Sequence, residues 1–155
     1  MLKSLFKTKV HACTAGQLVP LSDVPDTVFA EGMMGDGLAI VPEDGVFRAP
    51  FDGTITLISP TKHAFGMVTK DGIELLVHIG IDTVNLQGEG FEVIIEADTE
   101  VKQGTPIIKA DLDFIKSKDI PTITPMIVLS EHALTKNDKK LHNRVDHEVE
   151  VFSIR

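Results

Sequence analysis

Two histidines, His63 and His78, are the residues of this chain whose type and spacing best suit chemistry. A neutral imidazole nitrogen is nucleophilic near pH 7, and it can also shuttle a proton, bind a metal or accept a phosphoryl group. His78 lies within Ile73–Val84, which reads IELLVHIGIDTV. The odd positions up to Ile79 are apolar, which predicts a strand with one buried face and with His78 on the opposite face.

A β-hairpin is expected to join this strand to the apolar run that precedes it. The pair Asp71-Gly72 between the two runs is typical of a two-residue turn. With Lys70 paired to Ile73 across that turn, His78 lies opposite Phe65.

The same register places His63 on the face of His78, as its diagonal neighbour about 7–8 Å away between backbones. We therefore expect the two histidines to converge on an outward surface, beside Phe65 and Leu76.

The residues alone leave three interpretations of this pair open. The simplest is two exposed surface histidines. A zinc site needs a third protein ligand, and Asp36 or Asp82 would have to supply it because no His-x-His or His-x-x-x-His pattern lies nearby. Phosphoryl transfer needs a nucleophilic ring, donors for the phosphate oxygens and an open apolar rim. Thr61, His63, His78 and backbone N–H groups suit those needs.

Other catalytic motifs are absent from the sequence. There is no G-x-x-x-x-G-K-[ST] loop and no G-x-G-x-x-G after a strand, so nucleotide binding has no support. There is no G-x-S-x-G elbow, and only His11 lies near Cys13, which supports acyl transfer weakly. A buried small residue is the simpler interpretation of Cys13.

The composition is typical of a soluble globular protein with an acidic surface. The chain has 155 residues, 43% of them hydrophobic, and a formal net charge of −8. This charge argues against nucleic acid as a partner and suits a partner with a basic surface. The single cysteine excludes an intramolecular disulfide and fits a reducing cytosolic compartment.

Short apolar runs between Gly, Asp and Pro signals predict an all-β fold, a single-domain antiparallel β-sandwich or barrel with one or two short helical turns. The expected strands are Leu38–Val41, Val46–Ala49, Thr54–Ile58, Phe65–Thr69, Ile73–Ile79, Phe91–Ile95, Ile107–Ala110, Met126–Leu129 and Val149–Ile154. The expected helical segments are Val24–Ala30 and Asp111–Lys118, the second capped by Asp111. Residues 11–155 are expected to form one domain after a flexible tail over residues 1–10.

The N-terminal segment MLKSLFKTKV places Leu2, Leu5 and Phe6 on one helix face with lysines around them. Because the segment is short, it predicts at most a weak contact with a membrane surface. No stretch of the sequence approaches the roughly 20 apolar residues that a membrane-spanning helix needs.

Three segments of the chain resemble the glucose-type IIA component of the bacterial phosphoenolpyruvate-dependent sugar phosphotransferase system. They are Asp23–Ile40 (DVPDTVFAEGMMGDGLAI), Pro60–Gly66 (PTKHAFG) and Gly72–Val84 (GIELLVHIGIDTV), and the similarity runs from His11 to Leu129. The resemblance implies a cytoplasmic β-sandwich that receives a phosphoryl group from the carrier protein HPr. It then passes the group to a cysteine in the IIB domain of a sugar permease, and we expect this relay to require no cofactor.

The resemblance also implies roles for individual residues. His78 matches the histidine that is phosphorylated, through its Nε2. His63 matches the second active-site histidine, whose ring stabilises the phosphate, and Thr61 matches the threonine that orients that ring. Asp26 and Asp82 match acidic residues that meet arginines of the partners. The apolar rim on which both partners dock corresponds to Val28, Phe29, Met33, Met34, Phe65, Leu76 and Val84.

Two other functions remain open from the sequence. In a regulatory binding protein, the phosphorylation state of His78 would control docking on transporters or metabolic enzymes. A zinc hydrolase would use His63 and His78 as ligands, but the third protein ligand is missing. A Zn²⁺ ion that bridges the two histidines and a partner's carboxylate would not make the protein a hydrolase.

The resemblance weakens in the last quarter of the chain. The segment LHNRVDHE at 141–148 stands where the family has a glycine-containing turn before its final strand. The geometry of the last hairpin is therefore not predicted.

Overall fold

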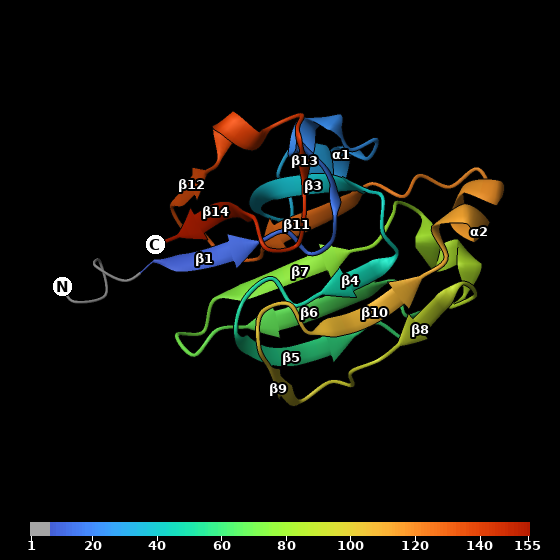
Figure 1. Ribbon diagram of the computed structural model, residues 1–155, viewed down its shortest axis with the longest axis horizontal. Helices are drawn as coiled ribbons and strands as arrows, with labels where there is room; N and C mark the ends of the chain where they lie inside the picture. Colours follow the sequence, from blue (N-terminus) through green and yellow to red (C-terminus); the bar gives the residue numbers. More distant parts are fainter. Residues whose placement is uncertain (1–6) are drawn as a thin grey trace.

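The computed structural model describes residues 7–155 and shows the all-β fold that the sequence predicts. The strands form three sheets, and all of the strand pairs are antiparallel (Figure 1). The eight-stranded sheet has the order β13 (Arg144–Val145), β2 (Gly16–Pro20), β3 (Asp36–Pro42), β11 (Thr124–Val128), β7 (Glu74–His78), β6 (Ala64–Val68), β5 (Gly53–Ile58) and β9 (Thr99–Val101).

Two three-stranded sheets complete the fold. One has the order β1 (Thr8–His11), β14 (Glu150–Ile154) and β12 (Leu134–Lys136), and the other has the order β4 (Val46–Arg48), β10 (Pro106–Ala110) and β8 (Phe91–Val93). The short helices between strands are α1 (Thr27–Ala30), α2 (Leu112–Ser117) and the 3₁₀ turns η2 (Leu21–Asp23), η3 (Thr83–Leu86) and η4 (Asp138–Lys140).

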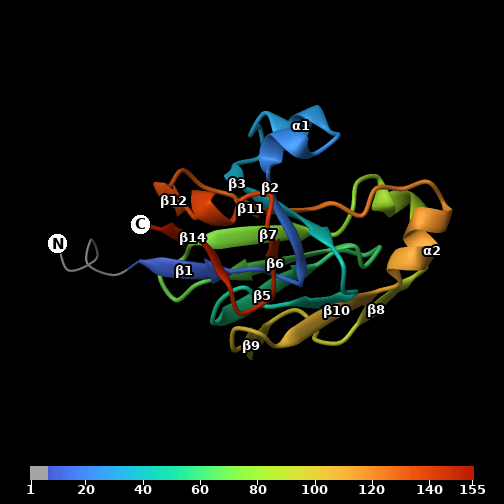
Figure 2. The same ribbon diagram turned by 45° about the horizontal axis from the view of Figure 1, so that its top comes forward.

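One hydrophobic core lies between the three sheets. Phe47 of β4, Leu75 of β7, Ile108 of β10 and Phe152 of β14 are each at most 1% exposed. Complete burial of a side chain of this kind contributes about 1.5–3 kcal/mol. Because these residues come from all three sheets, the core fixes the position of each sheet against the others (Figures 1 and 2).

A second, smaller apolar cluster lies on the opposite face of the eight-stranded sheet. It joins Leu76 of β7 and Ala39 of β3 to Leu21 of η2 and Phe29 of α1. Figure 2 shows α1 above the sheet, near β2 and β3. The segment that contains η2 and α1 therefore covers part of the face on which His78 lies.

All of the predicted strands are present, with small shifts at their ends, and the fold class is confirmed. Sequence reasoning missed β1, β2, β9, β12 and β13. β13 has two residues and β9 and β12 have three each, which is too short to show a period.

The two helical segments differ in how closely they match the helices predicted from the sequence. Asp111 caps α2 as predicted, because its carboxylate accepts a hydrogen bond from the backbone of Phe114 at 3.0 Å. The helix expected over Val24–Ala30 begins only at Thr27, where the carboxylate of Asp26 caps it through the backbone of Val28 at 2.9 Å.

The flexible tail expected over residues 1–10 is wrong for Thr8, Lys9 and Val10, which belong to β1 and pair with β14. Val10 is fully buried, so this strand is part of the core. The amphipathic face that we expect from Leu2, Leu5 and Phe6 lies outside the described residues. In the described part of the chain, no helix has both the length and the apolar character needed to cross a membrane.

The β6–β7 hairpin differs from its prediction by one residue. The loop has three residues, 70–72, because Thr69 donates its N–H to the carbonyl of Ile73 at 3.0 Å. Gly72 takes φ +86, the left-handed conformation that is common at the last position of three-residue hairpin loops. His78 therefore lies opposite Ala64, and the predicted pairing with Phe65 is wrong.

The segment 141–148 makes its turn without glycine. His142 takes φ +66, a conformation that favours glycine, and its N–H donates to the carbonyl of Leu18 at 2.6 Å. Val145 then pairs with Gly16, which attaches β13 to the edge of the large sheet.

Candidate active site

His78 is the last residue of β7 and is half-buried on the outer face of the sheet. Its Nδ1 lies 2.7 Å from the carbonyl oxygen of Gly80. Because a carbonyl oxygen only accepts hydrogen bonds, Nδ1 carries the hydrogen of the neutral ring and Nε2 keeps a lone pair. No hydrogen bond connects Nε2 to another residue of the described range 7–155.

Gly80 makes this contact possible because the backbone bends sharply there, with φ +75. A Cβ atom at this position would lie 2.5 Å from Cγ2 of Thr83 and 2.8 Å from the carbonyl oxygen of Pro121. The hydroxyl of Thr83 also donates to the carbonyl of Ile79 at 2.7 Å. The bend after His78 is therefore fixed by its surroundings and can hold only glycine without rearrangement.

His63 reaches the same place by a different route from the one predicted. It precedes β6 and follows Lys62, which has φ +64, so its direction comes from a turn and not from strand alternation. The carbonyl of His63 accepts a hydrogen bond from the N–H of Ile79 at 2.7 Å. The ring centroids of His63 and His78 are 4.8 Å apart, in an edge-to-face arrangement.

Two hydroxyls surround Nδ1 of His63. The Oγ1 of Thr61 lies 2.7 Å from this nitrogen, and the Oγ of Ser59 lies 3.4 Å away. Ser59 also accepts a hydrogen bond from the N–H of Ala64 at 3.1 Å, so it fixes the backbone at the start of β6. Sequence reasoning missed Ser59, and no motif in the sequence marks it.

The surroundings lower the pKa of both histidines below the ordinary value of 6.5. For His63, burial lowers the pKa first, and the nearby His78 lowers it further. For His78, burial lowers the pKa, while the hydrogen bond to Gly80 and the charges of Asp26 and Asp82 act in the opposite direction. Both rings are therefore mostly neutral at pH 7, the form in which an imidazole is a nucleophile.

Two acidic residues and one aromatic ring border the pair. Asp26, the cap of α1, and Asp82, which has φ +63, act on His78 from two different segments. The ring of Phe29 lies 5.1 Å from the ring of His78, centroid to centroid. Phe29 is only 6% exposed, so it supports His78 from the apolar cluster under α1.

The residues expected in the apolar rim divide into exposed and buried ones. The exposed residues are Val28 at 41%, Met33 at 72%, Met34 at 38% and Val84 at 50%. We call these four the docking surface. Phe29 is buried, as described above.

Phe65 and Leu76 correct two expectations. Phe65 is fully buried in the main core, because the one-residue change in register turns it inward. Leu76 does lie on the face of His78, but it is only 9% exposed because the cluster under α1 covers it. Neither side chain is placed to meet a partner.

Leu57 is an exposed apolar residue that sequence reasoning missed. It is 49% exposed and lies opposite Gly66, which in turn lies opposite Leu76. Leu57 thus shares the outer face with His78. An irregularity between Ile55 and Leu57 changes the alternation of β5, so the sequence pattern alone could not assign Leu57 to this face.

The geometry of the site gives little support to a cysteine nucleophile or to a metal site. Cys13 is fully buried, and burial raises its pKa to about 12, so it is not an activated nucleophile. Within residues 7–155, no group of three or more His, Cys, Asp and Glu side chains is arranged to hold a metal ion. A metal on His63 and His78 would need a ligand from another molecule.

An antiparallel β-sandwich with two neutral histidines, one with a free Nε2, has the features of a protein that carries a phosphoryl group on histidine. Residues 8–134 match the model of the family described as phosphoenolpyruvate-dependent sugar phosphotransferase system, EIIA 1. The chain belongs to this family, and its glucose-type resemblance is confirmed.

A solved structure agrees with this assignment. Glucose permease IIA from Mycoplasma capricolum is 38% identical to this chain, with a TM-score of 0.85 and coverage of 96% of each chain. The protein is thus a phosphocarrier of the sugar phosphotransferase system, and it takes part in a phosphoryl relay.

Proposed function

We propose that His78 is the residue that carries the phosphoryl group. In this proposal Nε2 of His78 accepts the group from phospho-HPr and passes it to a cysteine in the IIB domain of a sugar permease. The observation that carries the proposal is the 2.7 Å contact between Nδ1 and the carbonyl of Gly80, which leaves the lone pair on Nε2.

The two transfers balance without a further reactant. In the first, the P–N bond of phospho-HPr breaks as a P–N bond to Nε2 of His78 forms. In the second, that bond breaks as a P–S bond to the cysteine thiolate forms, and the ring of His78 is neutral again. The protein is a phosphotransferase in this sense, because the transferred group stays on it between two partners.

His63 and Thr61 support the transferred group in this proposal. In the proposed arrangement the hydroxyl of Thr61, 2.7 Å from Nδ1 of His63, is the donor, and Nε2 of His63 carries the ring hydrogen. With the two rings 4.8 Å apart, that N–H can donate to a phosphate oxygen on His78. Thr61 is thus a positioning residue that acts through His63.

The charges near the site keep the phosphoryl group transferable. A phosphohistidine must be stabilised only modestly, since a tightly held group would not leave for the cysteine. Asp26 and Asp82 are the charged residues that influence His78, and both are negative. They favour an approaching arginine of a partner and disfavour a lasting phosphate dianion.

The docking surface formed by Val28, Met33, Met34 and Val84 suits the partners HPr and IIB in turn. Exposed apolar residues beside a reactive group exclude water once a partner covers them, and this protects the phosphohistidine from hydrolysis. Leu57 of β5 adds an exposed apolar side chain on the outer face that carries His78.

The remaining expectations follow from this role. We infer one cytoplasmic domain over residues 11–155, since its partners HPr and IIB act in the cytoplasm. The relay needs no cofactor. Zn²⁺ could join His63 and His78 only with a further ligand such as a partner's carboxylate.

Intact-mass spectrometry tests this proposal. The protein is incubated with phosphoenolpyruvate, enzyme I and HPr and measured at mildly alkaline pH, at which phosphohistidine survives. The wild type is expected to gain one acid-labile phosphate, His78→Gln to gain none, and the control His132→Gln to behave as the wild type. A phosphate on folded His78→Gln would overturn the proposal.

A further inference from the structure

A cavity of about 500 Å³ lies at the opposite end of the β6–β7 hairpin from His78. Its walls come from β1, from residues 51–54, from the hairpin turn and from residues 100–103. Figures 1 and 2 show that this turn lies at the end of the molecule where β1 begins, away from α2. The volume is within the range of sites for small organic molecules.

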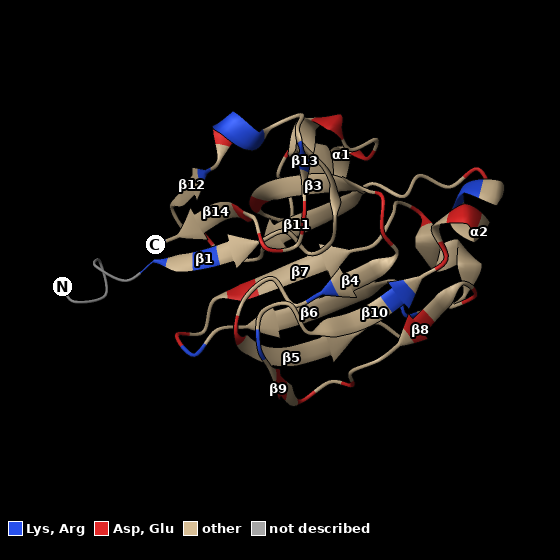
Figure 3. Ribbon diagram, in the orientation of Figure 1, with Lys and Arg blue, Asp and Glu red and all other residues tan. Residues whose placement is uncertain are grey.

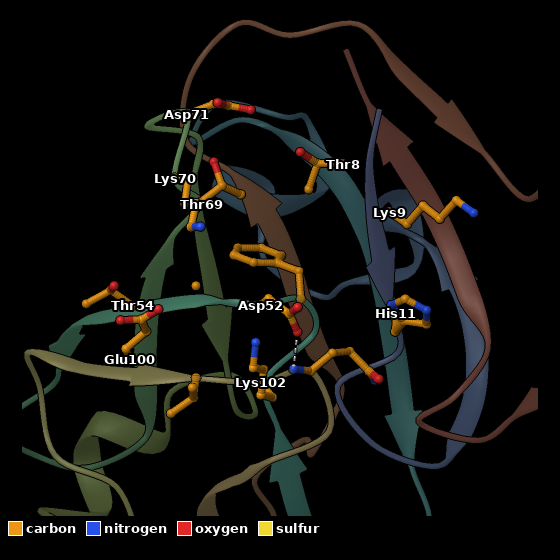
Figure 4. A pocket seen from close by; sticks show the side chains of 14 residues that line it. Thr8, Lys9, His11, Asp52, Thr54, Thr69, Lys70, Asp71, Glu100 and Lys102 are labelled. Atoms are coloured by element: carbon orange, nitrogen blue, oxygen red, sulfur yellow. Dashed lines mark hydrogen bonds between the residues drawn. The ribbon is translucent and has the colours of Figure 1, made fainter. Parts of the chain in front are cut away.

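Three lysines line the cavity from segments that are distant in the sequence. They are Lys9, Lys70 and Lys102, and all three are exposed. Neither of the two salt bridges found within residues 7–155 involves any of them. Figure 4 shows the side chain of Lys9 directed away from the cavity, so Lys70 and Lys102 are the two lysines that can pair with an anion inside it.

Carboxylates are interspersed with these lysines. Asp52, Asp71 and Glu100 also line the cavity, and one oxygen of Asp52 accepts the N–H of Gln103 at 2.7 Å. Figure 4 shows Asp71 across the cavity from Asp52, with Glu100 on a third side, and Figure 3 shows both signs of charge at the hairpin turn. The carboxylates repel a bare phosphate ion, but they accept hydrogen bonds from hydroxyl groups.

The cavity also has an apolar wall. Phe51 lines it and is only 4% exposed, so its ring is held by the core behind it. Thr54 and Thr69 add hydroxyl groups that can both donate and accept. A phosphorylated sugar requires three features of a site. Lysines bind its phosphate, carboxylates and hydroxyls bind its alcohol groups, and an aromatic face contacts its C–H groups.

We propose that this cavity binds a phosphorylated monosaccharide, with its phosphate on Lys70 and Lys102, its hydroxyls on Asp52 and Glu100, and its ring against Phe51. This site goes beyond the phosphoryl relay and does not depend on His78. Its ligand belongs to the class of compound that phosphorylation of an incoming sugar produces. The choice of this ligand class rests on the proposed function, in which the incoming sugar becomes phosphorylated.

Titration followed by backbone amide NMR tests the proposal with three probes: glucose 6-phosphate, glucose and inorganic phosphate. Glucose 6-phosphate is expected to shift the amides of 69–71 and 100–103 and to bind about tenfold or more tightly than either other probe. Equal binding of inorganic phosphate, or no shift of these amides, would overturn the proposal.

Paired variants test the lysines. Lys70→Gln combined with Lys102→Gln should weaken glucose 6-phosphate binding about tenfold or more, since two charge-assisted contacts are lost. The matched control replaces Lys116 and Lys118, at the end of α2, by Gln and should bind as the wild type. Thermal unfolding checks that both variants fold, and wild-type binding by the folded Lys70/Lys102 variant would refute the assignment.

The relay variant separates this proposal from the phosphocarrier mechanism. His78→Gln should bind glucose 6-phosphate as the wild type does, even though it accepts no phosphoryl group. Loss of glucose 6-phosphate binding in the folded His78→Gln protein would mean that the probe binds at the histidines and would overturn the separate site.

Discussion

The two ends of the β6–β7 hairpin treat phosphate in opposite ways. At one end, His63 and His78 are neutral, and the charges that reach His78 are the carboxylates of Asp26 and Asp82. At the other end, Lys70 and Lys102 line an open cavity in which carboxylates also lie. A site that must release a phosphoryl group avoids fixed cations, whereas a site that binds a phosphorylated compound gathers them. Phosphoryl transfer and binding of a phosphorylated compound are thus placed at opposite ends of the same pair of strands.

The largest expected effect comes from a pair of glycines that flank β7. Gly80→Ala should reduce the free energy of unfolding by about 3 kcal/mol, because strained backbone and close contacts combine. Gly72→Ala is the control, since Gly72 has φ +86 but a Cβ there would have no atom within 4 Å, and it should cost about 1 kcal/mol. Urea unfolding measures both values. Equal losses would show that the packing around Gly80 does not fix the bend after His78.

The second prediction removes the ring beside His78. His63→Ala should slow phosphoryl transfer about 10²-fold, or about 2.7 kcal/mol, because a preorganised donor to the phosphate is lost. Rapid-quench measurement of transfer from phospho-HPr gives the rate, with His132→Ala as the control. A rate within about twofold of the wild type would exclude a role for His63 in transfer.

Thr61 and Ser59 separate positioning from stability. Thr61→Val should slow transfer about tenfold, because Nδ1 of His63 loses its 2.7 Å partner. Ser59→Ala should mainly lower stability, by about 1 kcal/mol, since the N–H of Ala64 loses its acceptor. Transfer rates and urea unfolding are measured for both variants. The reverse pattern would assign the positioning role to Ser59.

The smallest effect concerns the titration of His78. NMR titration should place the pKa of His78 below 6.5, and Asp26→Asn should lower the pKa further because a charge that raises it is removed. The control Asp23→Asn should leave it unchanged. A rise in the pKa in Asp26→Asn would contradict the electrostatic account.

The same lowered pKa values make stability depend on pH. The folded protein favours the neutral rings of His63 and His78, so their contribution is complete above 6.5, the ordinary value. It is lost as the pH falls below 6.5 through the lower values of the folded state. Urea unfolding from pH 7.5 to 5.5 should show this loss in the wild type, and His63→Ala should reduce it.

The sequence predicts most of this fold because many strands are long enough to show alternation. β7 is the clearest case, with Leu75 in the core and His78 on the other face. β13 depends on pairing with β2 and carries no such pattern. The sequence pattern also could not predict the length of the β6–β7 loop, because an Asp-Gly pair fits loops of two or three residues.

That one-residue difference explains the mistaken part of the site. It moved Phe65 from the predicted docking rim into the core, although His63 still reaches His78 through the turn at Lys62. Leu57 was missed because an irregularity in β5 reverses its face. Motifs thus predicted which residues belong to the site. The directions of their side chains depended on loop lengths and strand irregularities, which the sequence pattern does not show.

The central claim is that His78 carries the phosphoryl group on Nε2 because Gly80 holds the hydrogen on Nδ1. A two-bond ¹H–¹⁵N correlation spectrum of the phosphorylated protein, recorded at mildly alkaline pH, distinguishes the two nitrogens of each ring. The account predicts phosphate on Nε2 of His78 and a protonated Nδ1 on the same ring. Phosphate on Nδ1 of His78, or on His63, would contradict it.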